Sequence, residues 1–228
     1  MFFDSYYFIL VIIPMLLGIW AQNKVSSTYK KYSRTACSNG FTGYQAARRI
    51  LDKNGLQNIQ IERVKGNLTD HYDPRTNVVR LSDGVYDSNS VAAIGVAAHE
   101  CGHAIQYATG YIPMKIRGAI IPVTNFGSKL AVPLVLAGMI LSWYPLAYIG
   151  LIGYALIALF QLITLPVEFD ASNRAVVTLS DMNITEAEQE GVKKVLSAAA
   201  MTYVAALITA VTQLIHMITI IGRRNNRR

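Results

Sequence analysis

Four long apolar blocks constrain this 228-residue chain more than any other feature of its sequence. They lie at about 2–21, 119–142, 146–165 and 198–221, and each has about the 20 residues that a membrane-spanning helix needs. Hydrophobic residues make up 52% of the chain and charged residues only 15%, against roughly 25% charged in an ordinary soluble domain. The sequence therefore predicts a membrane protein.

Basic residues set the expected orientation. The first block is followed by Lys24, Lys30, Lys31 and Arg34. Positive charge favours the cytoplasmic side, so we expect the N-terminus outside and the next segment inside. Four full crossings would then leave the arginine-rich C-terminal tail outside, against that rule. Two alternatives stay open for the last block: it crosses the membrane, or it lies partly in the membrane or against the protein without crossing.

The segment between the first two blocks has the patterns of a small α+β domain. A capping box at its start predicts a helix over 42–55, and apolar residues predict strands at 59–64 and 78–81. Ser90 is a suitable N-cap for an alanine-rich helix over 91–108. The expected fold is mainly α, with transmembrane helices and a small α+β domain that contains a short sheet.

These patterns divide the chain into five regions. They are an N-terminal transmembrane helix (1–22), the α+β region (23–117), a transmembrane hairpin (118–166), a polar helical region (167–196), and a C-terminal hydrophobic helix with a basic tail (197–228).

The chemistry is concentrated in one short motif. His99–His103 reads His-Glu-Cys-Gly-His, which fits H-E-x-x-H inside a predicted helix. Side chains four positions apart share a helix face, so both imidazoles can bind one Zn²⁺, with a third protein ligand and a water. Glu100 lies about 100° further round the helix, where its carboxylate can act as general base. The alternative is a helix whose histidines only satisfy local hydrogen bonds.

The third ligand must come from another segment, and Glu168 is the best candidate. A tight turn at Trp143–Pro145 would make the second and third blocks an antiparallel hairpin, which returns the chain to the membrane face it left. Glu168 follows this hairpin two residues after Pro166, near where the helix with His103 ends. The alternative is a carboxylate at a helix start, stabilised by the helix dipole.

Three other side chains remain candidates near the metal. Asp170 is a rival ligand or a hydrogen-bond partner of a ligand, because it lies about 200° from Glu168 on a helix and only one of the two can face the ion. His71 could be a ligand or an oxyanion donor, or a solvated loop histidine. Cys101 could bind as a thiolate, although a small buried side chain fits its position better.

A predicted strand precedes the motif helix. Its residues are Asn77, Val78, Val79, Arg80 and Leu81. In zinc peptidases with this helix, an edge strand can bind the substrate by strand addition, so these are candidate substrate-binding residues. An ordinary core strand is the alternative, and the two roles are compatible.

Three motifs together resemble a known family. The segments His99–Gln106, Leu81–Tyr86 and Leu165–Ala175 resemble the YugP-type neutral zinc metallopeptidases of bacterial membranes. The likeness extends from the first apolar block to the last. More distantly the chain is similar to the HtpX-type membrane proteases, whose pattern is H-E-x-x-H followed by E-x-x-A-D.

The resemblance assigns roles to residues of this chain. It implies metal ligands at His99, His103 and Glu168, a catalytic acid/base at Glu100, and an active site on the cytoplasmic side. Ser172 stands where the HtpX-type pattern has Asp, so either Ser172 or Asp170 would orient a ligand histidine. Arg174 would stabilise transition-state charge or extend to the membrane interface.

The sequence as a whole predicts an integral, multi-pass zinc endopeptidase of the bacterial cell membrane. Its zincin-like catalytic region is 23–117, and the helical region 167–196 supplies the third ligand. It would hydrolyse peptide bonds of membrane or membrane-proximal proteins with a zinc-bound water activated by Glu100. We expect one Zn²⁺ per chain, a polypeptide substrate, the lipid bilayer as surroundings, and no nucleic acid. The alternative is a zinc-stabilised membrane scaffold or pseudoprotease that binds partner proteins.

Overall fold

The computed structural model describes residues 8–225, so the start of the predicted first helix (1–7) and the last residues of the basic tail (226–228) lie outside the described residues. The chain divides into two compact units. One unit comprises the chain up to Gln22, Ile116–Leu165 and the chain from Met201 onward. The other comprises Asn23–Lys115 and Pro166–Ala200.

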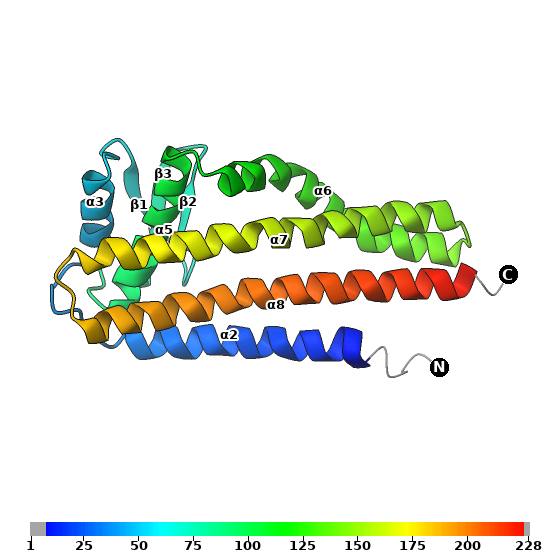
Figure 1. Cartoon of the computed structure of the whole chain (residues 1–228), viewed down its shortest axis with the longest axis horizontal. Helices are drawn as coiled ribbons and strands as arrows, with labels where there is room; N and C mark the ends of the chain where they lie inside the picture. Colours follow the sequence, from blue (N-terminus) through cyan, green and yellow to red (C-terminus); the bar gives the residue numbers. More distant parts are fainter. Residues whose placement is uncertain (1–7, 226–228) are drawn as a thin grey trace. The chain divides into compact units, whose positions relative to one another are not determined.

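Long helices dominate the described part of the chain, where four are long and apolar enough to cross a membrane. They are a π-helical turn η1 (Phe8–Ile12) continuing into α2 (Ile13–Tyr32), then α6 (Ile112–Ile140), α7 (Tyr144–Ser180) and α8 (Glu186–Asn225) (Figure 1). The predicted class, a mainly helical membrane protein with a small sheet, is confirmed.

Helices α6 and α7 form the predicted hairpin. They are joined by three residues, and Ser142 adopts a left-handed φ of 56° in this turn. The amide of Trp143 donates to the Gly138 carbonyl at 2.9 Å, which satisfies one of the last carbonyls of α6. A Cβ on Gly150 would lie 2.6 Å from the Ala131 carbonyl oxygen, so the absence of a side chain lets the two backbones touch.

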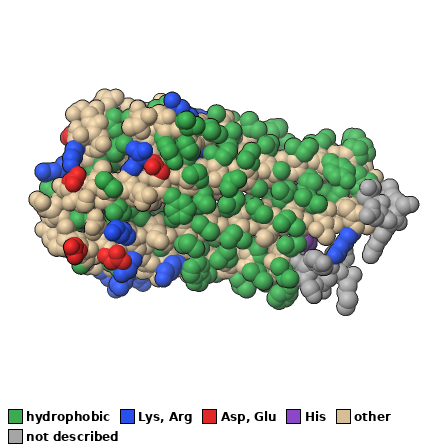
Figure 2. Space-filling model, viewed as in Figure 1, with side chains coloured by type: hydrophobic (Ala, Val, Ile, Leu, Met, Phe, Trp, Pro, Cys, Tyr) green, Lys and Arg blue, Asp and Glu red, His purple; other side chains and the backbone are tan. Residues whose placement is uncertain are grey.

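The outward surface of these helices is apolar. Large hydrophobic side chains such as Phe126, Leu136, Ile140 and Ile152 are exposed. Figure 2 shows hydrophobic side chains covering the long helices on the face in view, whereas most Lys, Arg, Asp and Glu side chains lie over the unit with the sheet. Such a surface is suited to lipid rather than to water.

The helices run beyond the apolar blocks that predicted them. Helix α7 passes Pro166 without a break and ends only at Ser180, and α8 begins twelve residues before the expected 198. The early start of α8 has a local cause, because Thr185 and Glu188 form a capping box: the Thr185 amide donates to Glu188 Oε2 at 2.7 Å, and the Glu188 amide donates to Thr185 Oγ1 at 3.2 Å.

The second unit contains a three-stranded sheet between short helices. Along the chain its elements are α3 (Gly43–Lys53), β1 (Gln60–Val64), β2 (His71–Asp73), β3 (Val78–Ser82), α4 (Asp83–Tyr86) and α5 (Val91–Ala108). The strand order is β1-β3-β2, with β1 parallel and β2 antiparallel to the central β3. The predicted caps are confirmed, since Thr42 and Gln45 form a capping box on α3 and Ser90 Oγ accepts from the Ala93 amide on α5.

The sheet order corrects one prediction. Residues 77–81 were expected to bind substrate by strand addition, but Val78, Val79 and Arg80 pair with β1 on one side and β2 on the other. Leu81 pairs with β1, and Asn77 lies in the turn before the strand with a left-handed φ of 56°. A strand already flanked on both sides has no free edge for a substrate, so this assignment is wrong.

Helix α5 is the central helix of this unit. It packs against α3 and the sheet (Figure 1), and most of its residues are buried. The surrounding core contains Ile50, Leu51, Leu81, Ile94, Leu179 and Val192. Because many of the buried α5 residues are alanine or glycine, neighbouring elements approach its backbone closely.

Candidate metal centre

Two histidines project from one face of α5. His99 and His103 are one helical turn apart, and their ring centroids are 4.7 Å apart with the planes at 81°. The His103 side chain is buried, and that of His99 is partly exposed. The spacing of the motif thus places two imidazoles next to each other at a semi-enclosed position.

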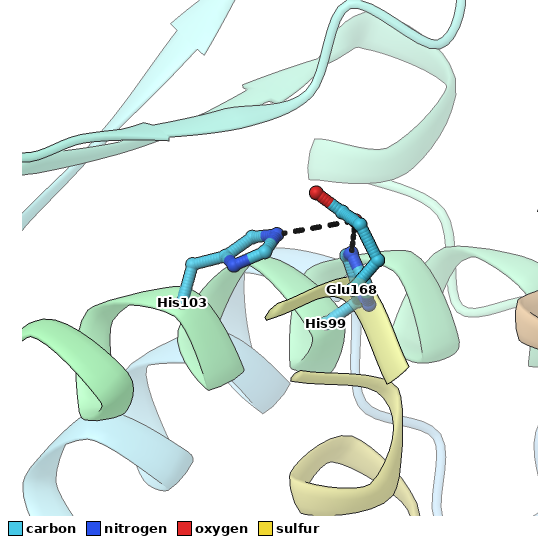
Figure 3. Close-up of side chains that lie close together, drawn as sticks. All are labelled: His99, His103 and Glu168. Carbon is cyan, nitrogen blue, oxygen red and sulfur yellow. Dashed lines mark hydrogen bonds and ion pairs between the residues drawn. The ribbon is translucent and has the colours of Figure 1, made fainter. Parts of the chain in front are cut away.

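Glu168 of α7 completes the group (Figure 3). Its Oε2 lies 3.3 Å from His99 Nε2 and 3.6 Å from His103 Nε2, and only 1% of the residue is exposed. One donor atom from each of the three residues lies within 4.8 Å of the others. Within the described range, no other group of His, Cys, Asp and Glu side chains meets this condition.

Glu168 reaches the histidines because α5 and α7 touch. A Cβ on Gly102 would lie 2.6 Å from the Ala171 carbonyl oxygen, so the glycine between the histidines is what permits this approach. On α7, Val167, Ala171 and Ala175 are fully buried at a spacing of four residues, which defines the contact face. Glu168 lies next to this face.

Glu100 lies beside the three donors without joining them. It is 8% exposed, and its Oε2 accepts a hydrogen bond of 3.0 Å from the Tyr72 amide. Burial, opposed by His99 and reinforced by the charges of Glu168 and Asp70, raises the pKa of Glu100 to about 7. Its carboxyl can therefore gain or lose a proton near neutral pH.

In each histidine Nε2 faces Glu168, and the other ring nitrogen, Nδ1, has a hydrogen-bonding partner. Ser172 Oγ lies 3.2 Å from His99 Nδ1, and Gln106 Oε1 lies 3.0 Å from His103 Nδ1. Asp170 faces neither ring, because its Oδ2 accepts from Gln106 Nε2 at 2.8 Å and from Arg174 Nε at 2.6 Å. Of the two alternative carboxylates, the structure thus brings Glu168 to the histidines and turns Asp170 toward Arg174.

The remaining candidates lie elsewhere. His71 is exposed on β2, and its Nδ1 lies 2.8 Å from the Thr69 carbonyl oxygen. Cys101 is fully buried on another face of α5, with Sγ 3.6 Å from the Ala47 carbonyl oxygen, and burial raises the pKa of its thiol. The Arg174 guanidinium carbon lies 5.8 Å from the centre of the Tyr111 ring. None of these three is part of the three-donor group.

Comparison with known proteins agrees with the motifs. A family model described as "Putative neutral zinc metallopeptidase" matches residues 7–222. The chain belongs to this family. A relative from Bacillus subtilis (strain 168), named "Putative membrane protease YugP", is 48% identical over 220 residues, which cover 95% of this chain and 98% of that protein. No solved structure gives a significant match. The family resemblance predicted from the motifs is confirmed.

Two residues of this family member were missed by sequence reasoning. Gln106 lies three residues after His103 on α5, so helical spacing alone could have indicated that it shares the histidine face. Tyr72 contributes a backbone amide rather than a side chain, and residue types carry no signal for that. Its contact with Glu100 depends on β2, a three-residue strand.

Proposed function

We propose that this member of the neutral zinc metallopeptidase family is an integral membrane zinc endopeptidase with His99, His103 and Glu168 as ligands. The observation that carries the proposal is the position of Glu100, which is buried beside the three donors and is not one of them. Structural zinc sites are closed by four protein ligands, whereas catalytic sites keep one position open. An unligated carboxylate next to an incomplete donor set fits the second kind.

The donor set suits zinc. Two imidazole nitrogens and one carboxylate oxygen form a ligand combination known from catalytic zinc sites. The Nδ1 atom of each ring has a hydrogen-bonding partner, Ser172 Oγ for His99 and the accepting Gln106 Oε1 for His103, as is usual for ligand histidines. A zinc ion held there would polarise the carbonyl of a scissile peptide bond and make a water molecule more acidic.

Glu100 would carry the proton of the reaction. The Tyr72 amide holds Oε2, which leaves Oε1 to take a proton from the attacking water. As the water oxygen bonds to the carbonyl carbon and the carbon–nitrogen bond breaks, Glu100 returns that proton to the departing amine. This assignment uses one residue as base and then as acid.

The outer edge of β2 is the proposed binding site for the polypeptide substrate, in place of β3. Strand β2 pairs with β3 on one side only. Because the Tyr72 amide donates to Glu100, it points away from β3 and toward the motif helix. The Tyr72 amide is already bonded to Glu100, so an extended peptide on this edge would pair through the Tyr72 carbonyl, and it would then pass beside Glu100 and the three donors.

We further propose that the site faces the cytoplasm of a bacterial cell. The support is the run of lysines and arginine after the first apolar block, which favours the inner side of the membrane. The substrates would then be membrane proteins or proteins close to the inner membrane surface.

Zinc content tests the proposed ligands. The full chain, purified in detergent, should contain about one zinc per molecule, and Glu168→Ala should lose most of it because the anionic donor is gone. The control is Glu190→Ala, which removes an exposed carboxylate of the same unit and should keep zinc. If Glu168→Ala kept the zinc content of the wild type, the third metal ligand would instead be Asp170, His71 or Cys101. Absence of zinc from the wild type would overturn the proposal in favour of a membrane scaffold.

A further inference from the structure

Gln106 has three hydrogen bonds and no exposure to solvent. Its Nε2 donates to the Val167 carbonyl oxygen and to Asp170 Oδ2, each at 2.8 Å, and its Oε1 lies 3.0 Å from His103 Nδ1. The side chain therefore connects α5 to Val167 and Asp170, which lie one position before and two positions after Glu168 on α7.

The amide of Gln106 can adopt only one orientation. Both partners of Nε2 are acceptors, because one is a carbonyl and the other a carboxylate bonded to Arg174. A flipped amide would place its oxygen against two oxygens in a buried space. The group near His103 is consequently the amide oxygen, which can only accept.

The orientation of the amide decides where His103 carries its proton. Since Gln106 Oε1 accepts, the donor must be Nδ1–H of the ring, and in a neutral imidazole Nε2 is then unprotonated. Nε2 is the nitrogen that faces Glu168. His99 differs, because its partner Ser172 is a hydroxyl that can donate or accept and so leaves the tautomer open.

We infer that Gln106 is a positioning residue that fixes the Nδ1–H form of His103 and holds Glu168 in register with it. The chain of donors runs from His103 to Gln106 to Asp170, and Arg174 donates to the same carboxylate oxygen from the other side. The inference rests on the proposed function, because it takes His103 and Glu168 as metal ligands.

Zinc affinity is the first test. Gln106→Met keeps the volume of the side chain and removes all three hydrogen bonds, so zinc binding to the full chain should weaken about 10- to 100-fold in competition with a chelator. Gln189→Met on α8 is the control and should bind as the wild type does. Equal affinity of Gln106→Met and wild type would overturn the inference, whatever happens to the melting temperature.

Moving the negative charge from position 170 to position 106 distinguishes a positioning role of Gln106 from a simple packing role. Gln106→Glu can still accept from His103, but it opposes the Asp170 carboxylate, so zinc should bind more weakly. Adding Asp170→Asn supplies a donor to the new carboxylate, and the double variant should recover at least tenfold of the lost affinity. A double variant no better than Gln106→Glu would contradict the role assigned to Gln106.

The tautomer itself can be observed without zinc. The chain has four histidines, so ¹⁵N-histidine labelling gives a simple NMR spectrum, in which His103→Asn identifies the His103 signals. At mildly alkaline pH the zinc-free wild type should show His103 protonated at Nδ1, and Gln106→Met should show a mixture. A proton on Nε2 in the wild type would refute the inference. This readout stays decisive even if the wild type binds no zinc and the proposed function fails.

Discussion

A shift of one position along α5 separates a proposed metal donor from a proposed proton carrier. His99 points to Glu168, whereas Glu100 points about 100° away and meets the backbone amide of β2. The same sequence motif thus produces two different environments: a group of convergent donors, and a buried carboxylate held at one oxygen.

Glu100→Gln tests this separation of roles. The amide oxygen of glutamine can still accept from the Tyr72 amide, so the fold and the zinc content should not change. Peptide cleavage should fall about 10²- to 10⁴-fold, because an amide cannot carry the proton. Zinc analysis and turnover of a peptide substrate are measured on the same sample. Cleavage at the wild-type rate would exclude Glu100 as the base.

The sequence predicts the placement of individual side chains best where one helix contains the whole motif. The spacing of His99 and His103 is sufficient to place both rings together. Helix geometry also predicts that only one of Glu168 and Asp170 can face them, but the choice needs the contact between α5 and α7. Helical spacing can place Gln106 beside His103, but the orientation of its amide depends on Val167 and Asp170, which are 61 and 64 positions away, so no local pattern contains that orientation.

Among elements, the contact between α5 and α7 matters most, because it joins the two segments that carry the donors. Gly102 and Ala171 touch at a point between His99 and His103 on α5 and next to Glu168 on α7. The same contact accounts for the continuous helix through Pro166. Proline costs about 3 kcal/mol inside a helix, and the buried face formed by Val167, Ala171 and Ala175 supplies packing that offsets it.

Gly102→Ala should therefore affect both stability and zinc binding. The new methyl group would lie 2.6 Å from the Ala171 carbonyl oxygen, so the helices must separate. We expect a loss of about 1–3 kcal/mol in unfolding free energy, as for other overpacked sites, together with weaker zinc binding. Gly118→Ala is the matched control, because nothing lies within 4 Å of that position, and it should be neutral or stabilising by up to about 1 kcal/mol. Unchanged melting and zinc affinity in Gly102→Ala would show that the helices can move apart freely.

The hydrogen bond between strand β2 and Glu100 can be tested in the same way as the contact between α5 and α7. Tyr72→Pro removes the amide that holds Glu100, and Tyr72→Ala removes the same ring but keeps the amide. A hydrogen bond to a charged group contributes about 1.5–3 kcal/mol, so Tyr72→Pro should lose at least about tenfold more kcat/KM than Tyr72→Ala. Both variants should retain zinc. Equal kcat/KM in the two variants would remove the Tyr72 amide from the mechanism.

The two best-predicted elements of the second unit, α3 and α5, have clear capping residues and helical periodicity. Strand β2 was not predicted because three residues are too few for an alternating pattern to be visible. Without β2 in the prediction, β3 has a free edge, and this is why the choice of β3 as the substrate strand is wrong. Edge and centre of a sheet are defined by pairing between distant segments, and a single strand sequence does not encode that order.

For the molecule as a whole, the proposed cytoplasmic site and the four helices long and apolar enough to cross a membrane predict one path of the chain through the bilayer. With the N-terminus outside, the unit with the sheet is inside, the turn between α6 and α7 is outside, and the segment after α7 is inside again. Helix α8 is long and apolar enough for a full crossing, so we expect its C-terminal end outside despite its arginines.

Thiol labelling in intact cells tests this threading. Cysteines introduced at Leu141 and Gly222 should react with a membrane-impermeant reagent, and one at Asn58 should react only after permeabilisation. The native Cys37 and Cys101 are buried, so the unmodified chain should give little background. Reaction at Asn58 in intact cells would reverse the orientation. A protected Gly222→Cys beside a reactive Leu141→Cys would mean that α8 does not cross.

Because the hairpin of α6 and α7 lies between His103 and Glu168, the order of synthesis determines when all three donors are present. His103 leaves the ribosome 65 residues before Glu168, and both apolar arms of the hairpin are made in between. At about 5–20 residues per second this interval lasts several seconds. A nascent or truncated chain that has not reached Glu168 lacks the third donor, so under the proposed function peptide-cleaving capacity would arise only after the hairpin has been made.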